Sequence, residues 1–382
     1  MLSKGYEIDD IQDLDIAESI FTPDEDEHVR RMQQRYGGYW RYPKLLDFSY
    51  SVNPYFPPER MKDELRANFD MLLTEYPSGM RVNSLLAAKN YSVHQENVLT
   101  GNGAADLLMH LMDNLDGKTG FIHPTFDEYP NRYLHGRSVD FIPENKDYAY
   151  TVDDLIQFFG DKEIQNLIVV NPDNLSGNYI LKADLLRLIE WSRKKGICIV
   201  IDESYTDFAD EENNTLIDQQ VISANSHLFI IKSVSKTCGV PGLRLSVLVS
   251  GNEKILALMK EQMSMRDVNS FAEFYMQIEE KYKKDYYTAL AKFREERARF
   301  QTELSKIRNL RVKPSQTNYI MVELDEKINS ADFLKKLLIR HNILLRELTP
   351  ESNSKNCLRI GVRCTEENNI LLSAMKEELD SL

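Results

Sequence analysis

The sequence has few cysteines and no long apolar run, and both absences limit what the protein can be. Four cysteines, Cys198, Cys238, Cys357 and Cys364, occur in 382 residues, with no CxxC pair and no histidine cluster beside them. This pattern indicates reduced thiols rather than disulfides or metal ligands. No apolar run approaches the ~20 residues of a membrane-spanning helix. The N-terminus, MLSKGYEIDDIQDLD, is too acidic and too polar for a signal peptide. We therefore expect a cytoplasmic protein that binds no metal.

Positive charge is also scarce. Lysine and arginine number 47 against 60 aspartates and glutamates, which gives a net charge of −13. An acidic surface repels nucleic acids and anionic membranes, so neither is an expected partner. Apolar residues make up 42% and charged residues 28% of the chain, as in a globular protein with a sizeable core. The length indicates two or three structural units.

Apolar runs bounded by turn residues alternate with amphipathic stretches from about residue 61 onward. Continuous apolar strands separated by helices indicate a mostly parallel sheet covered on both faces. Residues 269–308 are predicted to form one or two long exposed helices, followed by strands in NYIMVEL, ILLREL and CLRIGV. We predict an α/β fold with a large parallel-sheet domain and a smaller C-terminal α/β domain. The strands expected in the large domain lie near 121 and at 166–172, 197–203, 227–233 and 243–250.

These patterns divide the chain into four parts. Residues 1–30 form an acidic N-terminal segment, and residues 31–75 an N-terminal arm that includes a piece of the smaller domain. The large domain is expected to span residues 76–309 and the small C-terminal domain residues 310–382.

Polar residues follow three of the predicted strands, where open parallel sheets bind their ligands. Lys236 lies in KSVSKTCGVPGLR, a turn rich in small residues, and desolvation there would lower its pKa and favour imine formation. A single lysine of this kind is more often a solvated surface residue. Asp202 ends the apolar run ICIVID, where an unpaired charge is costly. Its alternative role is an ordinary helix N-cap.

Further groups suit a planar, phosphorylated ligand. Tyr205 and Asn174 follow two strands, although core packing and turn formation are their ordinary roles. Phe126 in HPTFDEY is placed to stack on a ring, although a single aromatic is more often core. A phosphate would suit the backbone N–H groups of GNGAAD and a guanidinium with hydroxyls. The phosphate-binding candidates are Gly103, Ala104, Ala105, Ser233, Ser235 and Arg244.

Pyridoxal phosphate requires each of these groups. It needs a lysine for the imine and a carboxylate that keeps the pyridine nitrogen protonated. Its phenolic oxygen needs hydrogen-bond donors, its ring a flat partner, and its phosphate a helix N-terminus with a cation. Each group alone is a weak signal, and the complete set in this order predicts pyridoxal 5'-phosphate as the cofactor.

The motifs GNGAAD, HPTFDEY, NPDNLSG, IDESY, SVSKTCGVPGLR and CLRIGV resemble, in this order, those of the fold-type I pyridoxal-phosphate aminotransferases. The similarity is to the branch of histidinol-phosphate aminotransferase and threonine-phosphate decarboxylase, and it covers roughly residues 45–382. It implies that Lys236 is the Schiff-base lysine and proton shuttle, and that Asp202 pairs with the pyridinium nitrogen. Asn174 and Tyr205 then contact the phenolic oxygen.

The same resemblance implies the remaining contacts. Phe126 would stack on the ring, Tyr76 would reach the phosphate from the other subunit of a homodimer, and Arg359 would bind the carboxylate of the amino donor. Contacts to the substrate are assigned more loosely, with solvated surface positions as the alternative, to Tyr50, Asn53, Arg81 and Arg363.

The N-terminal GYEIDDIQDLDIAESIF resembles the closing segment of sugar- and choline-phosphate-type nucleotidyltransferases. Carboxylates matching Glu7 and Asp9 help to bind Mg²⁺ there; on a strand they would share one face. A solvated acidic tail is the alternative. Because the rest of that domain is absent, we expect these residues to be inert, a remnant of a larger protein. The arrangement resembles the fused cytidylyltransferase–2-aminoethylphosphonate transaminases, which favours phosphonoacetaldehyde as the acceptor.

Four other functions compete with this interpretation. Leu175-Ser176 and Ala105 depart from the family pattern without removing a catalytic group, and they count against histidinol phosphate as the substrate. A threonine-phosphate-type decarboxylase would share the cofactor site, and a catalytically silent module would share only the fold. A sugar aminotransferase is disfavoured by Arg359 and the NPDNLSG turn.

Overall fold

The computed structural model describes residues 8–35, 37–42, 44–124, 137–145, 147–348 and 356–380. Internal contacts divide the chain into two compact units. We name as the large unit Val52–Arg299 with Lys313–Met321, and as the small unit Met1–Ser51, Phe300–Val312 and Val322–Leu382. Helix α14 and strand β10 each cross a boundary between them.

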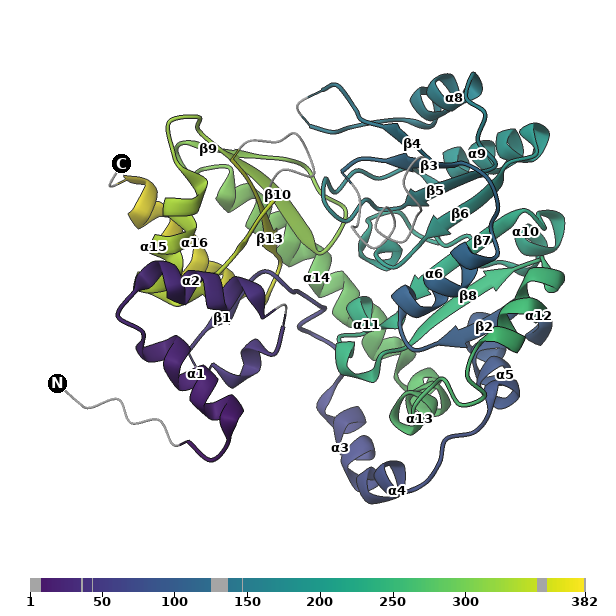
Figure 1. The fold of residues 1–382 in the computed structure, drawn as a ribbon, viewed down its shortest axis with the longest axis horizontal. Coiled ribbons are helices and arrows are strands. Elements are labelled where there is room, and N and C mark those ends of the chain that lie inside the picture. The colour runs from purple at the N-terminus through teal and green to yellow at the C-terminus, as the bar shows by residue number, and fades with distance from the viewer. Residues whose placement is uncertain are drawn as a thin grey trace. The chain divides into compact units, whose positions relative to one another are not determined.

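The large unit contains a seven-stranded sheet in the order β2-β8-β7-β6-β5-β3-β4 (Figure 1). Strand β8 runs antiparallel to both of its neighbours, and all other neighbouring strands are parallel. The sheet is therefore mostly parallel, as the sequence predicts. Its strands are β2 (Val98–Gly101), β3 (Thr119–Ile122), β4 (Ser138–Phe141), β5 (Asn166–Val170), β6 (Cys198–Asp202), β7 (Leu228–Ser233) and β8 (Ser246–Ser250).

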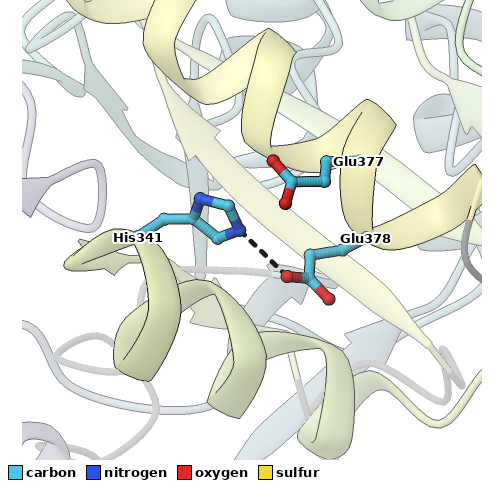
Figure 2. Close-up of side chains that lie close together, drawn as sticks. All are labelled: His341, Glu377 and Glu378. Atoms are coloured by element: carbon cyan, nitrogen blue, oxygen red, sulfur yellow. Dashed lines mark hydrogen bonds and ion pairs between the residues drawn. The ribbon is translucent and has the colours of Figure 1, made fainter.

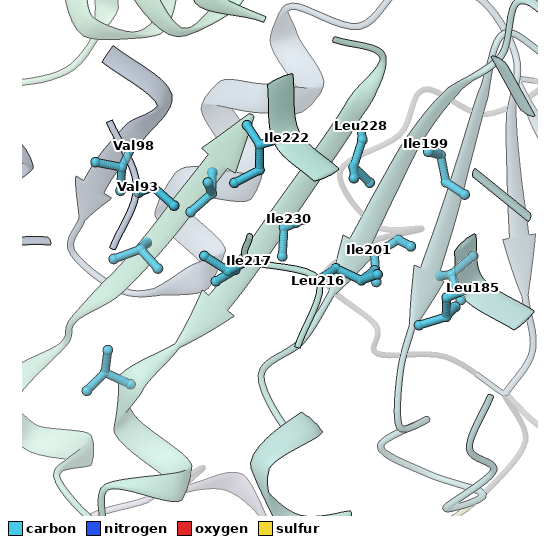
Figure 3. Close-up of a cluster of buried hydrophobic side chains, with 14 of the residues drawn as sticks. Val93, Val98, Leu185, Ile199, Ile201, Leu216, Ile217, Ile222, Leu228 and Ile230 are labelled. Carbon is cyan, nitrogen blue, oxygen red and sulfur yellow. The ribbon is translucent and has the colours of Figure 1, made fainter. Parts of the chain in front are cut away.

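Both faces of this sheet are buried because alternate residues of each central strand enter different clusters. In β5, Leu167 and Val169 pack on one face and Ile168 and Val170 on the other. The first cluster includes residues of α8 (Val152–Gly160), α9 (Lys182–Lys195) and α10 (Gln219–Ala224), some of which Figure 3 shows. The second includes residues of α6 (Ala104–Asp113) and α12 (Glu253–Gln262).

The stretch 269–308 forms a nine-residue helix, α13 (Ser270–Ile278), and one long helix, α14 (Lys283–Leu304), and neither is simply exposed as predicted. In α14, Phe293 and Arg297 are fully buried, and the Arg297 guanidinium donates to the backbone oxygen of Phe208 at 2.7 Å. The many charged residues in this stretch predict exposed helices, so this burial differs from the prediction. The other helices of the large unit are α3 (Glu59–Ala67), α4 (Phe69–Thr74), α5 (Met80–Tyr91) and α11 (Val234–Thr237), with short 3-10 turns at Gln95–Asn97, Thr206–Phe208, Pro241–Leu243 and Glu279–Tyr282.

The small unit combines a four-stranded sheet, β12-β13-β10-β9, with a parallel pair, β1-β11. The predicted strand ILLREL is split into two, because β11 pairs with β1 whereas β12 pairs with β13. The elements of this unit are α1 (Ile11–Phe21), α2 (Glu25–Gln34), a 3-10 turn (Tyr39–Arg41), β1 (Leu46–Asp47), β9 (Leu310–Val312), β10 (Tyr319–Leu324), α15 (Ser330–His341), β11 (Ile343–Leu344), β12 (Arg346–Glu347), β13 (Cys357–Gly361) and α16 (Thr365–Asp380).

The acidic N-terminal segment folds as two capped helices. The Asp10 carboxylate accepts from the backbone N–H groups of Gln12 and Asp13 at the start of α1, and Asp24 caps α2 in the same way. Apolar residues of this segment form a cluster with α15 and β11, which ties it to the small unit. Asp9 precedes α1, so the strand considered for it is not present, and Glu7 lies outside the described residues.

Across the ranges that the structure describes, no helix is both long enough and apolar enough to cross a membrane.

Substitution of a sheet residue tests how much this core contributes to the stability of the fold. Ile199 is fully buried in β6, and we expect Ile199→Ala to lower the free energy of unfolding by about 2–4 kcal/mol, because it leaves a cavity. Leu181→Ala is the control, since Leu181 is 51% exposed, and it should change stability by less than about 0.5 kcal/mol. Urea denaturation measures both. Equal effects of the two substitutions would contradict the assigned core.

Candidate active site

The register of the sheet brings three strand ends together. Ser246 at the start of β8 lies opposite Gly101 at the end of β2 and also opposite Ser233 at the end of β7. Because β8 is antiparallel, its first residue meets the last residues of both neighbours. The loops that follow β2 and β7 and precede β8 therefore meet at one edge, which is the edge where such sheets bind ligands.

The loop after β2 leads directly into α6, and its shape depends on a glycine. Gly103 has φ +97°, a conformation that other residues rarely adopt. A Cβ atom at this position would lie 2.5 Å from Nη2 of Arg244, so the guanidinium packs directly against the glycine backbone. Helix α6 begins at Ala104, and no side chain within the described chain caps it. These N–H groups and the guanidinium suit an anion.

Two serine hydroxyls at the same edge lack partners. Ser235 Oγ and Ser246 Oγ are buried, and among the described residues neither has a hydrogen-bond partner. Buried hydroxyls normally form a hydrogen bond, so a ligand that accepts from them would relieve this cost. Ser233 is buried too, and its backbone N–H donates to Ser204 Oγ at 3.1 Å. The predicted phosphate-binding residues therefore fit the phosphate group of pyridoxal phosphate.

The groups predicted for the ring of the cofactor follow β5, β6 and β7. Asp202 is buried at the end of β6, and its Oδ1 accepts from the backbone N–H of Ser204 at 2.8 Å. Asn174 Nδ2 donates to the Tyr205 hydroxyl at 3.3 Å, and Lys236 Nζ lies 5.0 Å from the centroid of the Tyr205 ring. The structure thus brings together the predicted lysine, tyrosine and asparagine.

The turn that carries Asn174 is held by a buried aspartate. Asp173 Oδ1 accepts from the backbone N–H groups of Leu175 and Ser176 and from Ser176 Oγ, at 2.7–2.9 Å. Burial raises the pKa of Asp173 to about 6, although the hydrogen bonds from Ser176 and Leu175 lower it. The departure of Leu175-Ser176 from the family pattern thus leaves an internally bonded turn.

The turn that carries Lys236 is held by Asn53. The backbone N–H of Asn53 donates to the Lys236 carbonyl at 2.9 Å, and Asn53 Nδ2 donates to the Thr237 carbonyl at 3.0 Å. Its Oδ1 accepts from the backbone N–H of Tyr55. Asn53 is fully buried, so its side chain is engaged in holding the turn, and its predicted contact with substrate stays a prediction.

The remaining predicted residues lie in different places. Tyr76 is 84% exposed, and the Arg266 guanidinium lies 4.9 Å from the centroid of its ring. Arg81 is exposed on α5, and Phe126 lies outside the described residues. The roles predicted for Tyr76, Arg81 and Phe126 therefore stay predictions.

Three predicted residues belong to the small unit. Arg359 is buried in β13, and its Nη2 donates to the Ser49 carbonyl at 3.1 Å. The Tyr50 ring stacks on Tyr39 with centroids 6.1 Å apart. Arg363 pairs with Glu367 at 2.8 Å. The guanidinium of Arg363 is thus engaged within its own unit, whereas substrate binding by Arg359 and Tyr50 stays a prediction.

Sequence reasoning missed a pair of carboxylates beside the phosphate loop. The backbone N–H of Asn102 donates to Asp106 at 3.3 Å and to Asp267 at 3.1 Å, so the two carboxylates meet at one donor. Burial, followed by the hydrogen bond and charge of Asp106, raises the pKa of Asp267 to about 6. The two residues are far apart in the sequence, and only the fold reveals the pair.

One group of metal-type ligands occurs among the described residues, and it lies in the small unit (Figure 2). Ligand atoms of His341, Glu377 and Glu378 lie within 4.8 Å of one another. His341 Nε2 lies 2.9 Å from Glu378, and the Arg340 guanidinium lies 3.4 Å from the same carboxylate. These contacts make the group a link between α15 and α16.

Comparison with known proteins identifies the family of this chain. The model of the family "Aminotransferase class I and II" matches residues 43–374. The chain is 28% identical over 374 residues to CMP-5'-(3-aminopropyl)phosphonate synthase of Streptomyces rubellomurinus. The match covers 97% of this chain and 59% of the synthase. It is 29% identical over 350 residues to L-serine phosphate decarboxylase of Sulfurospirillum multivorans, with 87% and 88% covered.

The structural comparison gives the same result. The histidinol-phosphate aminotransferase of Clostridium acetobutylicum superposes with a TM-score of 0.78 at 25% identity, over 88% of this chain and all of that one. The fold is therefore that of the fold-type I pyridoxal-phosphate enzymes. The chain belongs to the class I and II aminotransferase family, it is an enzyme of the pyridoxal-phosphate-dependent aminotransferase class, and pyridoxal phosphate is its cofactor.

The carboxylate pair predicts a pH-dependent stability. The pKa of Asp267 is higher in the folded protein than its ordinary value of 3.8, so the folded state loses stability as the pH rises from about 4 to about 6. Asp267→Asn removes the ionisation. We expect the substitution to raise the free energy of unfolding, relative to the wild type, by about 1 kcal/mol more at pH 7 than at pH 4. This value is reduced because Asp267 is partly exposed.

Urea denaturation at the two pH values measures this difference. Asp113→Asn serves as the control for the loss of one carboxylate, because Asp113 is exposed on the same helix, α6. A pH-independent effect of Asp267→Asn would contradict the mutual repulsion of the pair.

Proposed function

We propose that this enzyme transfers an amino group from an amino acid to phosphonoacetaldehyde and so forms 2-aminoethylphosphonate. The observation that carries the proposal is the similarity to CMP-5'-(3-aminopropyl)phosphonate synthase, which extends over 97% of this chain. The match therefore takes in most of the N-terminal segment, which is the part of the sequence that resembles a nucleotidyltransferase. The name of that relative contains a short aminoalkylphosphonate, the same chemical class as the proposed product.

The catalytic roles follow from the groups around Tyr205. Pyridoxal phosphate, when bound, supplies an aldehyde and a ring that accepts electrons. Lys236 holds the cofactor, and its amine moves the proton at the α-carbon of the amino donor. Asp202 keeps the proton on the ring nitrogen, because a buried carboxylate stabilises a neighbouring positive charge. Asn174 and Tyr205 donate to the phenolic oxygen.

The remaining proposed roles concern binding. The α6 N-terminus with Arg244 and the neighbouring serines holds the phosphate of the cofactor. Phe126 stacks on the ring, and Arg359 binds the carboxylate of the donor. Tyr50 and Asn53 are the proposed contacts to the acceptor.

A homodimer with shared sites is part of the proposal. Apolar side chains on and near α4 are exposed, among them Leu73 at 63%, Tyr76 at 84% and Met265 at 70%. Exposed apolar side chains gathered in this way support an interface. Tyr76 would then reach the cofactor phosphate of the partner copy.

We also propose that the chain acts together with a cytidylyltransferase domain in a fused, cytoplasmic protein. The match covers 97% of this chain but only 59% of the Streptomyces synthase, whose name includes CMP. A transaminase that makes a small phosphonate amine would supply a suitable acceptor for cytidylyl transfer.

A decarboxylase that acts on a phosphorylated amino acid is the second candidate. The similarity to L-serine phosphate decarboxylase covers 87% of this chain and 88% of that protein. Such an enzyme would share the cofactor site and differ in the bond broken at the α-carbon, which is C–H in transamination and C–COO⁻ in decarboxylation. Histidinol-phosphate transamination is a further alternative within the same branch.

The substrate decides between these reactions. With 2-aminoethylphosphonate and a keto acid, we expect the purified enzyme to form phosphonoacetaldehyde and the matching amino acid. ³¹P NMR measures the aldehyde, and amino-acid analysis measures the amino acid. 2-Aminoethylphosphonate has no carboxylate, so a decarboxylase cannot release CO₂ from it. Release of CO₂ from phosphoserine or phosphothreonine, with no amino transfer, would favour the second candidate.

Lys236→Ala tests the proposed lysine in either reaction. We expect activity to fall by about 10²–10⁴-fold, because the variant lacks the group that moves the proton. Borohydride reduction of the wild-type holoenzyme, followed by peptide mass mapping, should place the cofactor on Lys236. Lys195→Ala, an exposed position at the end of α9, is the control. A label on any other lysine would overturn the proposed role of Lys236.

A further inference from the structure

A buried ion pair lies between the two segments that carry the proposed catalytic groups. Lys232, four residues before Lys236, belongs to β7, and Asp207 lies in the 3-10 turn two residues after Tyr205. Lys232 Nζ is 2.6 Å from Asp207 Oδ1, and the two side chains are only 8% and 18% exposed. The pair therefore joins the segment of Asp202 and Tyr205 to the segment of Lys236.

Charged and titratable groups of other elements also face this pair. The Tyr286 hydroxyl of α14 donates to Asp207 Oδ2 at 2.5 Å, and the Arg294 guanidinium, also of α14, donates to the Asp207 carbonyl at 2.8 Å. Glu203, the residue after β6, interacts electrostatically with Lys232. Asp207, Lys232, Tyr286 and Arg294 line a cavity of ≈ 570 Å³ with Thr237 and Cys238, the two residues that follow Lys236.

Both members of the pair are charged. Burial alone would raise the pKa of Asp207, but the charge of Lys232 and the hydrogen bonds from Lys232 and Tyr286 hold it below its ordinary value. Burial alone would lower the pKa of Lys232, but the carboxylates of Asp207 and Glu203 hold it above its ordinary value. Burial also raises the pKa of Glu203, although the charge of Lys232 lowers it. The opposite charges of Asp207 and Lys232 therefore compensate each other.

An uncompensated charge at this place would act on Lys236. Charges in a protein interior interact over several ångströms with little screening. Compensation removes that field, and the short contacts of Asp207 to β7 and α14 brace the strand that leads into the turn of Lys236. Neither effect requires the pair to contact substrate.

We propose that Asp207 and Lys232 are positioning residues that brace the strand leading into Lys236 and cancel each other's charge beside it. The proposal rests on the proposed role of Lys236 as the lysine that holds the cofactor. Without such a role, Lys232 in β7 and Asp207 in the turn after Tyr205 would form an ordinary ion pair of the core.

Opposite charge changes in the holoenzyme test this proposal. The visible absorbance of the lysine-bound cofactor changes with pH, and the midpoint of that change reports the electrostatic environment of Lys236. Asp207→Asn leaves the positive charge of Lys232 uncompensated, so we expect the midpoint to fall by about one pH unit. Lys232→Met leaves the negative charge of Asp207 uncompensated, so we expect the midpoint to rise by about the same amount.

The double variant Asp207→Asn/Lys232→Met removes both charges and should return the midpoint close to the wild-type value. A merely structural role would not give shifts of opposite sign that cancel. Arg187→Met is the matched control, because Arg187 and Asp153 form an ion pair at 2.5 Å on the surface of the same unit. It should leave the midpoint unchanged.

Two outcomes overturn the proposal: single variants that shift the midpoint in the same direction, or folded variants that do not shift it. Circular dichroism verifies folding. If Lys232→Met does not fold, Asp207→Asn decides alone, and an unchanged midpoint refutes the charge compensation. Failure of the proposed role of Lys236 is distinguishable, because borohydride would then label another lysine of the wild-type enzyme.

Discussion

The site depends on one constraint of the sheet, the antiparallel strand β8 between the parallel strands β2 and β7. A strand inserted in this direction presents its first residue to the last residues of both neighbours, so Ser246 lies between Gly101 and Ser233. Three loops then meet at one edge, although they come from distant parts of the sequence. In a fully parallel sheet, the segment with Arg244 would enter its strand at the opposite edge.

This convergence explains how a strongly acidic protein provides a place for a phosphate. The net charge of −13 says nothing about the local field, which the N-terminus of α6, two buried hydroxyls and one guanidinium make favourable to an anion. An arrangement unfavourable to an anion lies beside the same loop, where Asp106 and Asp267 both accept from the backbone N–H of Asn102. Favourable and unfavourable charges thus lie beside the same loop, and the fold tolerates the second because the carboxylates are only partly buried.

The sequence was sufficient to predict the sheet of the large unit and the groups that follow its strands. Asp202, Lys236 and Asn174 could be predicted because apolar runs mark strand ends and parallel strands expose those ends together. The antiparallel direction of β8 could not be predicted, since the apolar pattern of a buried strand is the same in both directions. The engagement of Asn53 with the turn of Lys236 was also hidden, because it depends on a contact across more than 180 residues. Likewise, the charged residues of α14 suggested exposure, whereas Arg297 is buried by its hydrogen bonds to the backbone.

The small unit is built from three separate stretches of chain, and this has a consequence for biosynthesis. Strand β1 near the N-terminus pairs with β11, which lies about 300 residues later, and the apolar residues of α1 and α2 pack against α15. Because a ribosome synthesises a chain from the N-terminal to the C-terminal end, α1, α2 and β1 emerge long before α15 and β11, with which they pack or pair. The large unit, in contrast, has nearly all of its sheet available before then. Until α15 and β11 have emerged, the apolar residues of α1 and α2 are therefore exposed to chaperones and to other nascent chains.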